Sequence, residues 1–135
     1  MKTQIRKRSG KRDAVLGIIR STKTHPPAGW VYERLKPDFP GLSLGTVYRN
    51  IRVLLEDGGL VSVGVVNGEE RFDGMVEPHP HFICEKCGAV IDIDARAVTG
   101  RKKLVEISGC AIDKRKTVFY GVCKACNVGN AAVGR

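Results

Sequence analysis

The first part of the chain consists of amphipathic segments separated by helix-breaking residues. Apolar residues recur at helical spacing over residues 12–20, which predicts a first helix. A second helix is expected to begin at Pro27, because proline is tolerated in the first turn, and to end before Pro37. A third helix is expected to begin after its N-cap, Ser43. Its buried stripe is predicted to contain Leu44, Val47, Ile51, Leu54 and Leu55.

A β-hairpin is predicted directly after the third helix. Valines alternate with other residues over positions 61–65, Asn67-Gly68 supplies a turn, and residues 71–72 lie on the returning strand. Three helices followed by a hairpin is the order of a winged-helix DNA-binding domain, in which the third helix reads the DNA. We therefore predict such a domain over residues 1–74.

The second half of the chain has a different pattern. Residues 75–81 contain two prolines and are expected to form a hinge. Residues 90–93 and 118–122 have strand-like composition, and a helix is expected between about residues 96 and 107. Short strands around one helix indicate a small α/β domain over residues 82–135, which we expect to carry dimerisation and metal binding. The fold class expected for the whole chain is α+β.

The composition is that of a folded protein with a thin core. Of 135 residues, 42% are hydrophobic and 27% are charged, which excludes a disordered chain. Two halves of this size typically need additional stabilisation, such as a bound metal. No apolar run reaches the roughly 18 residues of a membrane span, so no membrane association is expected. The basic N-terminus lacks the apolar segment of a secretory signal, so we expect a cytoplasmic protein with reduced thiols.

The net charge of +9 is concentrated near the N-terminus, where residues 1–23 hold eight basic side chains against a single acid. Such a run is either a solvated arm or an arm that binds phosphates. On the third helix, the face opposite the apolar stripe is centred on Arg49, which is either solvated or paired with a guanine edge. Because the arm, the hairpin and this face coincide, we favour contact with double-stranded DNA. The candidate contacts are Arg12, Thr46, Tyr48, Arg49, Asn50 and Arg52.

Four of the five cysteines form two Cys-x-x-Cys pairs, Cys84 with Cys87 and Cys123 with Cys126. Each pair has the spacing of a zinc knuckle, and two pairs complete a tetrahedral thiolate site. A single pair would also suit a redox motif, and disulfides are the other alternative. Two pairs together favour structural zinc. Cys110 stands alone and is expected to be a small apolar residue of the core.

The histidines indicate a second metal site. His79 and His81 are two residues apart in an expected extended segment, so both rings point to the same side. Asp73 and Asp92 flank this segment and supply carboxylates. His25 lies far away in the sequence, and its residue type and position alone indicate nothing beyond an ordinary surface or core histidine.

Several runs of sequence together resemble the ferric uptake regulator (Fur) family. They follow the order and spacing of that family over nearly the whole chain. These runs are His-Pro-Pro-Ala at 25–28, Thr-Val-Tyr-Arg-Asn at 46–50, Leu-Val at 60–61, Arg-Phe-Asp at 71–73, His-x-His-Phe-Ile-Cys-Glu-x-Cys-Gly at 79–88, and Tyr-Gly-Val-Cys-x-x-Cys at 120–126.

The resemblance implies a regulatory metal held by one histidine of the DNA-binding domain, the His-x-His pair and two carboxylates. On this chain these are His25, Asp73, His79, His81 and Asp92. Two aspartates are typical of the peroxide-sensing PerR branch, whereas iron-sensing members tend to have glutamate at the position of Asp92. The implied function is a homodimeric repressor that uses Fe(II) or Mn(II), with structural Zn(II), on a pseudo-palindromic operator. Peroxide would oxidise His25 or His79 through bound iron.

Three features restrict the resemblance or compete with it. Pro78 and Arg115 stand where many members have histidines of a further metal site, so that site is expected to be absent, and Pro80 is unusual between ligand histidines. The nearest alternative is a family member that senses the availability of iron, manganese or zinc. A thiol-disulfide protein and a zinc-ribbon RNA-binding module are alternatives from other classes. No nucleophile–base arrangement is evident, so we do not expect an enzyme.

Overall fold

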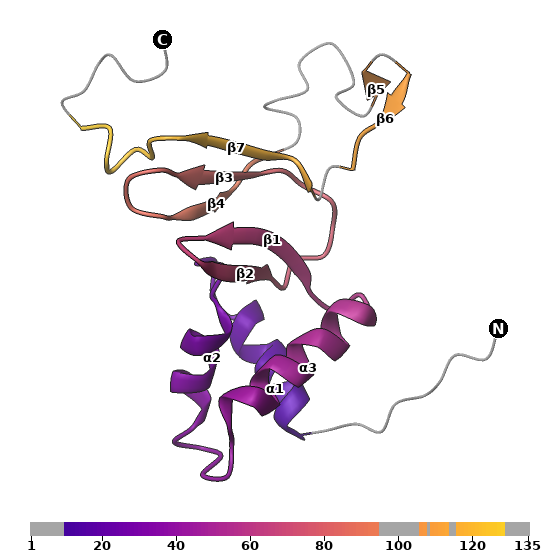
Figure 1. Ribbon diagram of the computed structural model, residues 1–135, viewed down its shortest axis with the longest axis vertical. Helices are drawn as coiled ribbons and strands as arrows, with labels where there is room; N and C mark the ends of the chain where they lie inside the picture. The colour runs from indigo at the N-terminus through magenta and orange to yellow at the C-terminus, as the bar shows by residue number, and fades with distance from the viewer. Residues whose placement is uncertain (1–9, 95–105, 108, 114–115, 129–135) are drawn as a thin grey trace.

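The computed structural model describes residues 10–94, 106–107, 109–113 and 116–128 (Figure 1). Three helices come first, α1 Gly10–Arg20, α2 Ala28–Leu35 and α3 Leu44–Glu56. A hairpin follows, made of β1 Val61–Val66 and β2 Glu69–Asp73. The remaining strands are β3 His81–Cys84, β4 Val90–Asp92, β5 Glu106–Ile107, β6 Cys110–Ala111 and β7 Val118–Gly121. In the described part of the chain, no helix is long and apolar enough to cross a membrane.

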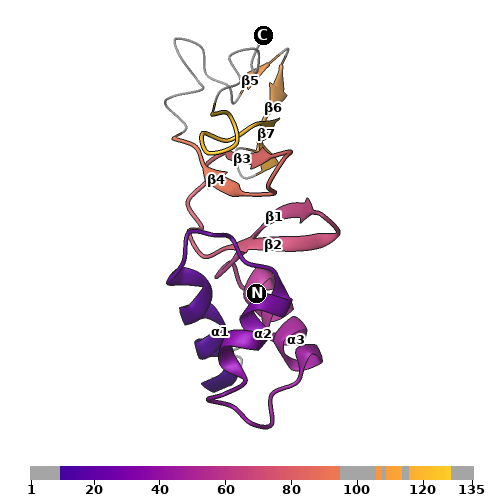
Figure 2. The ribbon, with the colours of Figure 1, turned by 90° about the vertical axis from the view of Figure 1, so that its left-hand side faces the viewer.

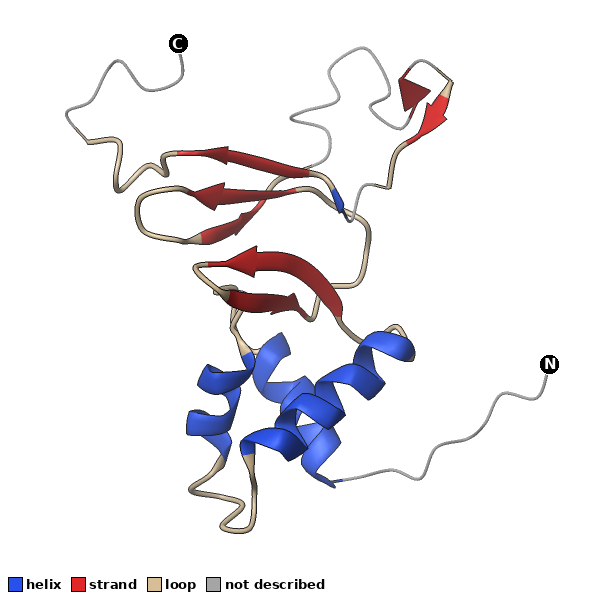
Figure 3. Ribbon diagram, in the orientation of Figure 1, coloured by secondary structure: helices blue, strands red, loops and turns tan. Residues whose placement is uncertain are grey.

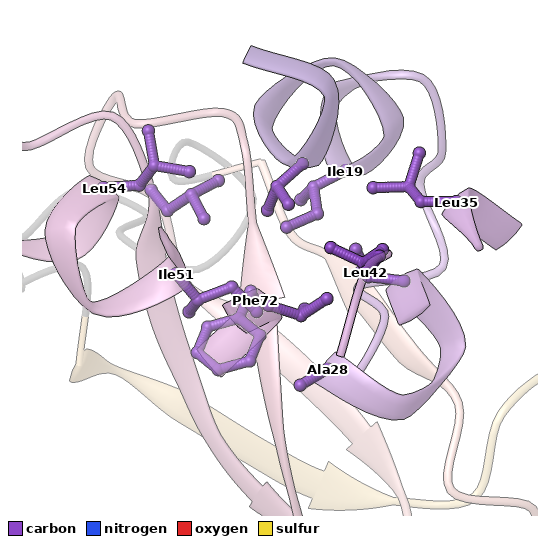
Figure 4. Close-up of a cluster of buried hydrophobic side chains, with 11 residues drawn as sticks. Ile19, Ala28, Leu35, Leu42, Ile51, Leu54 and Phe72 are labelled. Carbon is purple, nitrogen blue, oxygen red and sulfur yellow. The ribbon is translucent and has the colours of Figure 1, made fainter. Parts of the chain in front are cut away.

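Helix α3 begins after Ser43 as predicted, whereas α1 begins at Gly10, before the predicted residue 12, and α2 begins at Ala28, with Pro27 as its N-cap. The three helices enclose one apolar core (Figure 4). Ser43 caps α3, because its Oγ accepts a hydrogen bond from the backbone N–H of Thr46 at 3.1 Å. The buried stripe of α3 differs from the expected one. Leu44, the first residue of the helix, is 40% exposed, and Asn50 is buried beside Val47, Ile51 and Leu54. The core comprises Val15, Ile19, Ala28, Val31, Leu35, Leu42, Val47, Ile51, Leu54, Leu60 and Phe72.

The hairpin has the predicted turn but not the predicted alternation. Asn67 and Gly68 both have positive φ, 52° and 80°, which a two-residue turn of this kind requires. The register shifts between Ser62 and Gly64, and this bulge moves the following residues to the other face. Val66 is therefore buried, whereas Val65 is 65% exposed. The prediction of plain alternation through Val65 was wrong for this reason.

The hairpin lies between the helices and the second sheet, as the views in Figures 1 and 2 show. On one face, Phe72 belongs to the helical core. On the other face, Val63 and Val66 pack with Ile83 and Val90 of the second sheet, and Val118 packs against this cluster. The two faces of one short hairpin therefore connect both halves of the chain through apolar contacts.

The second sheet has the strand order β4-β3-β7 (Figure 3). Strands β3 and β4 are antiparallel, with His81 opposite Asp92. Strands β3 and β7 are parallel, with Cys84 opposite Gly121. These registers bring the end of β4 to the start of β3, and they bring the segment after β7 to the Cys84 end.

Two expectations for the second half need correction. The predicted helix over residues 96–107 falls mostly on residues 95–105, which lie outside the described residues, but its last two positions form strand β5. Cys110 is not a core residue. It begins β6, which pairs with β5 in a two-stranded sheet, and it is exposed there.

Candidate metal centres

Five side chains from five different places in the fold form a His–Asp cluster. His25 lies in the connection between α1 and α2, and Asp73 ends β2. His79 precedes β3, His81 begins β3, and Asp92 ends β4. The donor atoms of His25, Asp73, His81 and Asp92 all lie within 4.8 Å of one another. His79 joins them, because its Nε2 contacts both carboxylates.

The cluster has a regular geometry in which each imidazole Nε2 contacts the same two carboxylate oxygens. His25 Nε2 lies 3.2 Å from Asp73 Oδ2 and 2.7 Å from Asp92 Oδ1. The corresponding distances are 3.0 and 2.8 Å for His79. They are 2.9 and 3.1 Å for His81.

Hydrogen bonding alone does not account for these six contacts. An Nε2 atom carries at most one proton, so three rings can supply three donors for six N–O contacts. Ligands at right angles around an ion, each about 2.1 Å from it, are separated by about 3.0 Å, which is the spacing seen here. The arrangement therefore fits a shared cation held by His25, Asp73, His81 and Asp92, with His79 beside the two carboxylates.

The carboxylates change the protonation of the histidines. Burial disfavours charge on His25, but the hydrogen bonds and charges of Asp73 and Asp92 outweigh it and raise the pKa of His25 above its usual 6.5. The pKa of His79 is also raised, although burial opposes it. For Asp73, burial is outweighed by hydrogen bonds from His25 and His81, so its pKa lies well below the usual range. The carboxylates therefore favour a positive charge at the centre of the cluster.

The three rings differ in how their other nitrogen is held. His79 Nδ1 lies 2.7 Å from the carbonyl oxygen of Glu77, so a proton on Nδ1 leaves the Nε2 lone pair directed at the carboxylates. The Nδ1 atoms of His25 and His81 are buried without a hydrogen-bond partner among the described residues. Only the tautomer of His79 is therefore set by a neighbouring backbone group.

Two cavities give access to the cluster from solvent. One, of about 250 Å³, is lined by residues that include Asp73 and Asp92. The other, of about 660 Å³, includes His79 and Asp92. Lys23 and Met75 line both cavities. A small uncharged molecule can therefore approach the donors, and a thioether lies on its route.

The second candidate centre is a four-cysteine cluster made of Cys84, Cys87, Cys123 and Cys126, whose sulfurs lie within 4.8 Å of one another. The Sγ atoms of Cys87 and Cys123 are 3.7 Å apart. Four sulfurs at about 2.3 Å from a tetrahedral ion would be separated by about 3.8 Å. None of the four forms a disulfide. The geometry suits one tetrahedral ion such as zinc.

Backbone amides prepare one of these sulfurs to carry charge. The N–H groups of Cys87 and Cys123 donate to Cys84 Sγ at 3.4 and 3.3 Å, and they lower the pKa of Cys84 to about 6. The thiol of Cys126 shares hydrogen bonds with neighbouring sulfurs, chiefly Cys123, and its pKa is raised to about 12. A cation would replace the protons that the crowded sulfurs otherwise share.

The predicted DNA-contacting residues do not all lie on one surface. Tyr48, Arg49 and Arg52 are exposed on α3, with Tyr48 at 53%. Arg49 donates from Nη2 to Thr46 Oγ1 at 3.0 Å, which holds its side chain along the helix. Asn50 is only 8% exposed and belongs to the buried side of α3. Arg12 is half-buried on α1. Their roles on DNA stay predictions.

Residue patterns alone did not single out two groups that the structure places at these centres. Arg71 contacts the carbonyl oxygens of Thr24, His25 and Gly88. Met75 lines both cavities, and its N–H donates to Asp73 Oδ1 at 2.8 Å. The sequence places Arg71 two residues before Asp73, but this position does not show which groups the Arg71 side chain contacts.

The helices, hairpin and paired metal-binding clusters define a metal-dependent transcriptional regulator. Residues 4–120 match the ferric uptake regulator family. The chain belongs to this family.

Individual relatives agree with this assignment. The chain is 33% identical over 117 residues to the peroxide-responsive repressor PerR of Staphylococcus aureus, which covers 86% of this chain and 79% of that protein. It is 31% identical to the Campylobacter jejuni peroxide stress regulator, with a TM-score of 0.70 over 86% of this chain and 88% of the other. The Helicobacter pylori ferric uptake regulator shares the fold, with 21% identity and a TM-score of 0.74 over 90% and 82% of the two chains.

These findings identify a metal-binding transcriptional repressor similar to the peroxide-responsive members of its family. Regulators of this family bind DNA and are not enzymes. The fold is α+β, with helices in the N-terminal part and a sheet bearing the four-cysteine cluster in the C-terminal part.

Proposed function

We propose that this chain is a homodimeric repressor that senses peroxide through Fe(II) held by the His–Asp cluster. The observation that carries the proposal is the convergence of three imidazoles and two carboxylates, with no sulfur among them. Nitrogen and oxygen donors favour Fe(II) or Mn(II) over softer ions that prefer thiolates. The similarity of the chain to peroxide-responsive proteins also supports a redox-active metal at this cluster.

The ligands come from both halves of the chain, which gives the metal a means to control the hinge. His25 and Asp73 belong to the helix-and-hairpin part, whereas His79, His81 and Asp92 lie at or after the hinge. A cation bound by all five stabilises the closed arrangement, because only that arrangement brings every donor to it. The closed arrangement is proposed to be the one that fits DNA.

Peroxide would act on the ligands that hold the iron. Fe(II) bound there would activate peroxide next to the rings. Overall, the O–O bond would break, one oxygen would be inserted into a ring C–H bond of His25 or His79, which gives up two electrons, and the other oxygen would leave as water. The added oxygen weakens the donation of Nε2, so the ring no longer stabilises the closed arrangement. Mn(II) would support DNA binding without this oxidation.

The four-cysteine cluster is proposed to hold structural Zn(II). It links the turn after β3 to the segment after β7, and these segments are far apart in the sequence. Zinc binding therefore contributes directly to folding of this sheet.

Dimerisation through residues 82–122 is supported by an apolar stripe on the sheet. Ile91 of β4 and Phe119 of β7 are both opposite Phe82 of β3, so the three side chains share one face. Ile91 is 41% and Phe119 36% exposed. The other face packs on the hairpin through Ile83 and Val90. A second copy is the proposed occupant of this stripe, and sedimentation of Phe119→Asp should show monomers.

The test of peroxide sensing is to locate the oxygen added after one equivalent of peroxide. Fe(II)-loaded protein should gain about 16 Da on peptides containing His25 or His79, whereas Mn(II)-loaded protein should not. Cleavage after Arg71 and Lys86 places His79 and Met75 on the same peptide, so the gain must be assigned by fragmentation. The variant Met75→Leu removes the thioether, and fragmentation then distinguishes His79 from His81 and Cys84, which lie on the same peptide.

The outcomes separate the proposed function from its alternatives. Unmodified histidines and continued DNA binding after peroxide would favour a sensor of metal availability. Oxidation confined to the cysteines, with release of zinc, would favour a thiol switch instead.

A further inference from the structure

We propose that Arg71 is a positioning residue that couples the two candidate metal centres, so that occupation of the four-cysteine cluster strengthens metal binding at the His–Asp cluster. The inference rests on the proposed metal site of the His–Asp cluster but not on peroxide sensing. It assigns a role to a side chain that belongs to neither cluster.

One guanidinium contacts three backbone carbonyl groups from two segments that are distant from each other in sequence. Arg71 Nε donates to the carbonyl oxygen of His25, and Nη2 donates to that of Thr24 at 2.7 Å. On its other side, Nη1 makes a longer hydrogen bond of 3.4 Å to the carbonyl oxygen of Gly88. Because the guanidinium is planar and rigid, displacement of one carbonyl changes the geometry available to the other two.

The first two contacts hold a strained segment of backbone. His25 has a φ of 54°, which is uncommon for a residue with a side chain and must be maintained by its surroundings. The next residue of β2 supports the same segment, because the N–H of Phe72 donates to the carbonyl oxygen of Pro26 at 3.2 Å. Arg71 and Phe72 thus fix the backbone from which the His25 ring reaches the carboxylates.

The third contact reaches the knuckle that carries Cys84 and Cys87. The N–H of Gly88 donates to the carbonyl oxygen of Cys84 at 2.9 Å and closes this turn. Gly88 also lies against the end of the hairpin. A Cβ there would be 2.7 Å from Asn67 Nδ2 and 3.5 Å from Val66 Cγ1. A metal at the four-cysteine cluster fixes the turn and therefore fixes the Gly88 carbonyl that Arg71 contacts.

Coupling of this kind is reciprocal. If zinc at the four-cysteine cluster favours the backbone position of His25, metal at the His–Asp cluster must equally favour retention of zinc. Strand β3 offers a second route, since it carries both His81 and Cys84. A variant of Arg71 is needed to separate the two routes.

The first experiment measures Mn(II) affinity of the zinc-loaded full chain by titration of free Mn(II). Arg71→Lys retains the charge, but an ammonium group cannot span three carbonyls. We expect its Mn(II) affinity to fall by about 10-fold or more, the usual effect of losing a residue that orients a ligand. Arg34→Lys is the matched control, because Arg34 is exposed and stacks on Trp30 of the same helix, α2, away from both clusters. It should bind Mn(II) as the native chain does.

Zinc content and melting temperature are measured on the same samples. A residue that only stabilises the fold would lower the melting temperature while leaving Mn(II) affinity of the folded protein unchanged. Native Mn(II) affinity in a folded, zinc-loaded Arg71→Lys chain would overturn the proposal.

The second experiment first uses the native chain, so its result does not depend on a variant that could be less stable. Transfer of zinc to a chelator is followed with and without saturating Mn(II). Mn(II) should slow the transfer in the native chain and in Arg34→Lys, and this difference should be smaller in Arg71→Lys, in which only strand β3 connects the clusters. An undiminished difference in Arg71→Lys would assign the coupling to β3 and overturn the proposal. Equal rates with and without Mn(II) in the native chain would overturn the coupling. Failure of the native chain to bind Mn(II) at all would instead refute the proposed function on which the coupling rests.

Discussion

The two metal-binding clusters differ in where their donors lie and in what surrounds them. The four-cysteine cluster draws its sulfurs from one sheet, at the turn after β3 and the segment after β7. The His–Asp cluster draws its donors from the helical connection, the hairpin and the sheet. A metal at the first stabilises one unit, whereas a metal at the second stabilises the arrangement of two. The proposed folding role of the first cluster and the proposed regulatory role of the second are consistent with this placement of their donors.

The clusters also differ in access and in donor type. The His–Asp cluster contains imidazole and carboxylate donors and borders two cavities, so small molecules can reach it. The four-cysteine cluster contains thiols, one of which is already stabilised as a thiolate by backbone amides. Soft donors retain zinc tightly, and hard donors accept an exchangeable, redox-active ion. The following predictions test this comparison.

The largest effect is expected from removing the four-cysteine cluster. Cys84→Ser combined with Cys123→Ser should abolish zinc binding, the dimer and much of the folded structure, since structural zinc sites contribute on the order of 10 kcal/mol to folding. Elemental analysis and circular dichroism provide the readouts. Cys110→Ser is the control and should keep its zinc, because Cys110 is exposed on β6. Full zinc in the double variant would refute the assignment.

Removing one donor of the other cluster should have a more selective effect. His25→Ala should lose Mn(II) affinity by more than about 100-fold, because a direct ligand matters more than the residues that orient it. DNA binding should lose its dependence on Mn(II), whereas zinc content should remain native. Calorimetric titration and a DNA mobility assay measure the two properties. If His25→Ala lost its zinc as well, the clusters would not have separate roles.

A smaller effect is expected at the exposed face of α3. Arg49→Ala should relax the sequence preference at one operator position by roughly 1–3 kcal/mol, the range for a lost base contact. Deleting residues 1–8 should instead weaken binding to all sequences and reduce its dependence on salt. Selection from a random DNA library compares these variants with Arg34→Ala as the control. An unchanged selection profile for Arg49→Ala would show that this face does not read the DNA.

The smallest effect is a pH dependence of metal binding. The pKa values of His25 and His79 are raised, so protons compete with the metal. In the metal-free protein, the stabilisation from these protonated rings is complete below pH 6.5 and is lost as pH rises through the raised pKa. Mn(II) affinity should accordingly increase from about pH 6 to about pH 8 and then level off. An affinity independent of pH over this range would contradict the protonation described for the cluster.

Local features of the fold followed from the sequence where one residue type determines the geometry. Ser43 caps α3, and Asn67-Gly68 adopts the left-handed turn that its residues favour. The spacing of the cysteine pairs likewise indicated the four-cysteine cluster. Such features depend on neighbours in the chain, so a single sequence contains the information needed to predict them.

Features that depend on distant parts of the chain were harder to predict. The bulge before Gly64 exposes Val65, and the packing of α3 buries Asn50. His25 reaches Asp92 only because both halves of the chain meet, and family resemblance rather than residue pattern suggested its role. The contacts of Arg71 arise from the same meeting. Single-sequence periodicity does not report how two units are placed against each other.

The most direct test of the central claim is release of operator DNA by peroxide. Fe(II)-loaded protein bound to an operator fragment receives one equivalent of peroxide, and bound DNA and oxidised histidine are measured in the same sample. We predict that DNA is released in proportion to the oxygen added at His25 or His79, and that Mn(II)-loaded protein stays bound. Continued DNA binding by the Fe(II)-loaded protein, with both histidines unmodified, would contradict this claim.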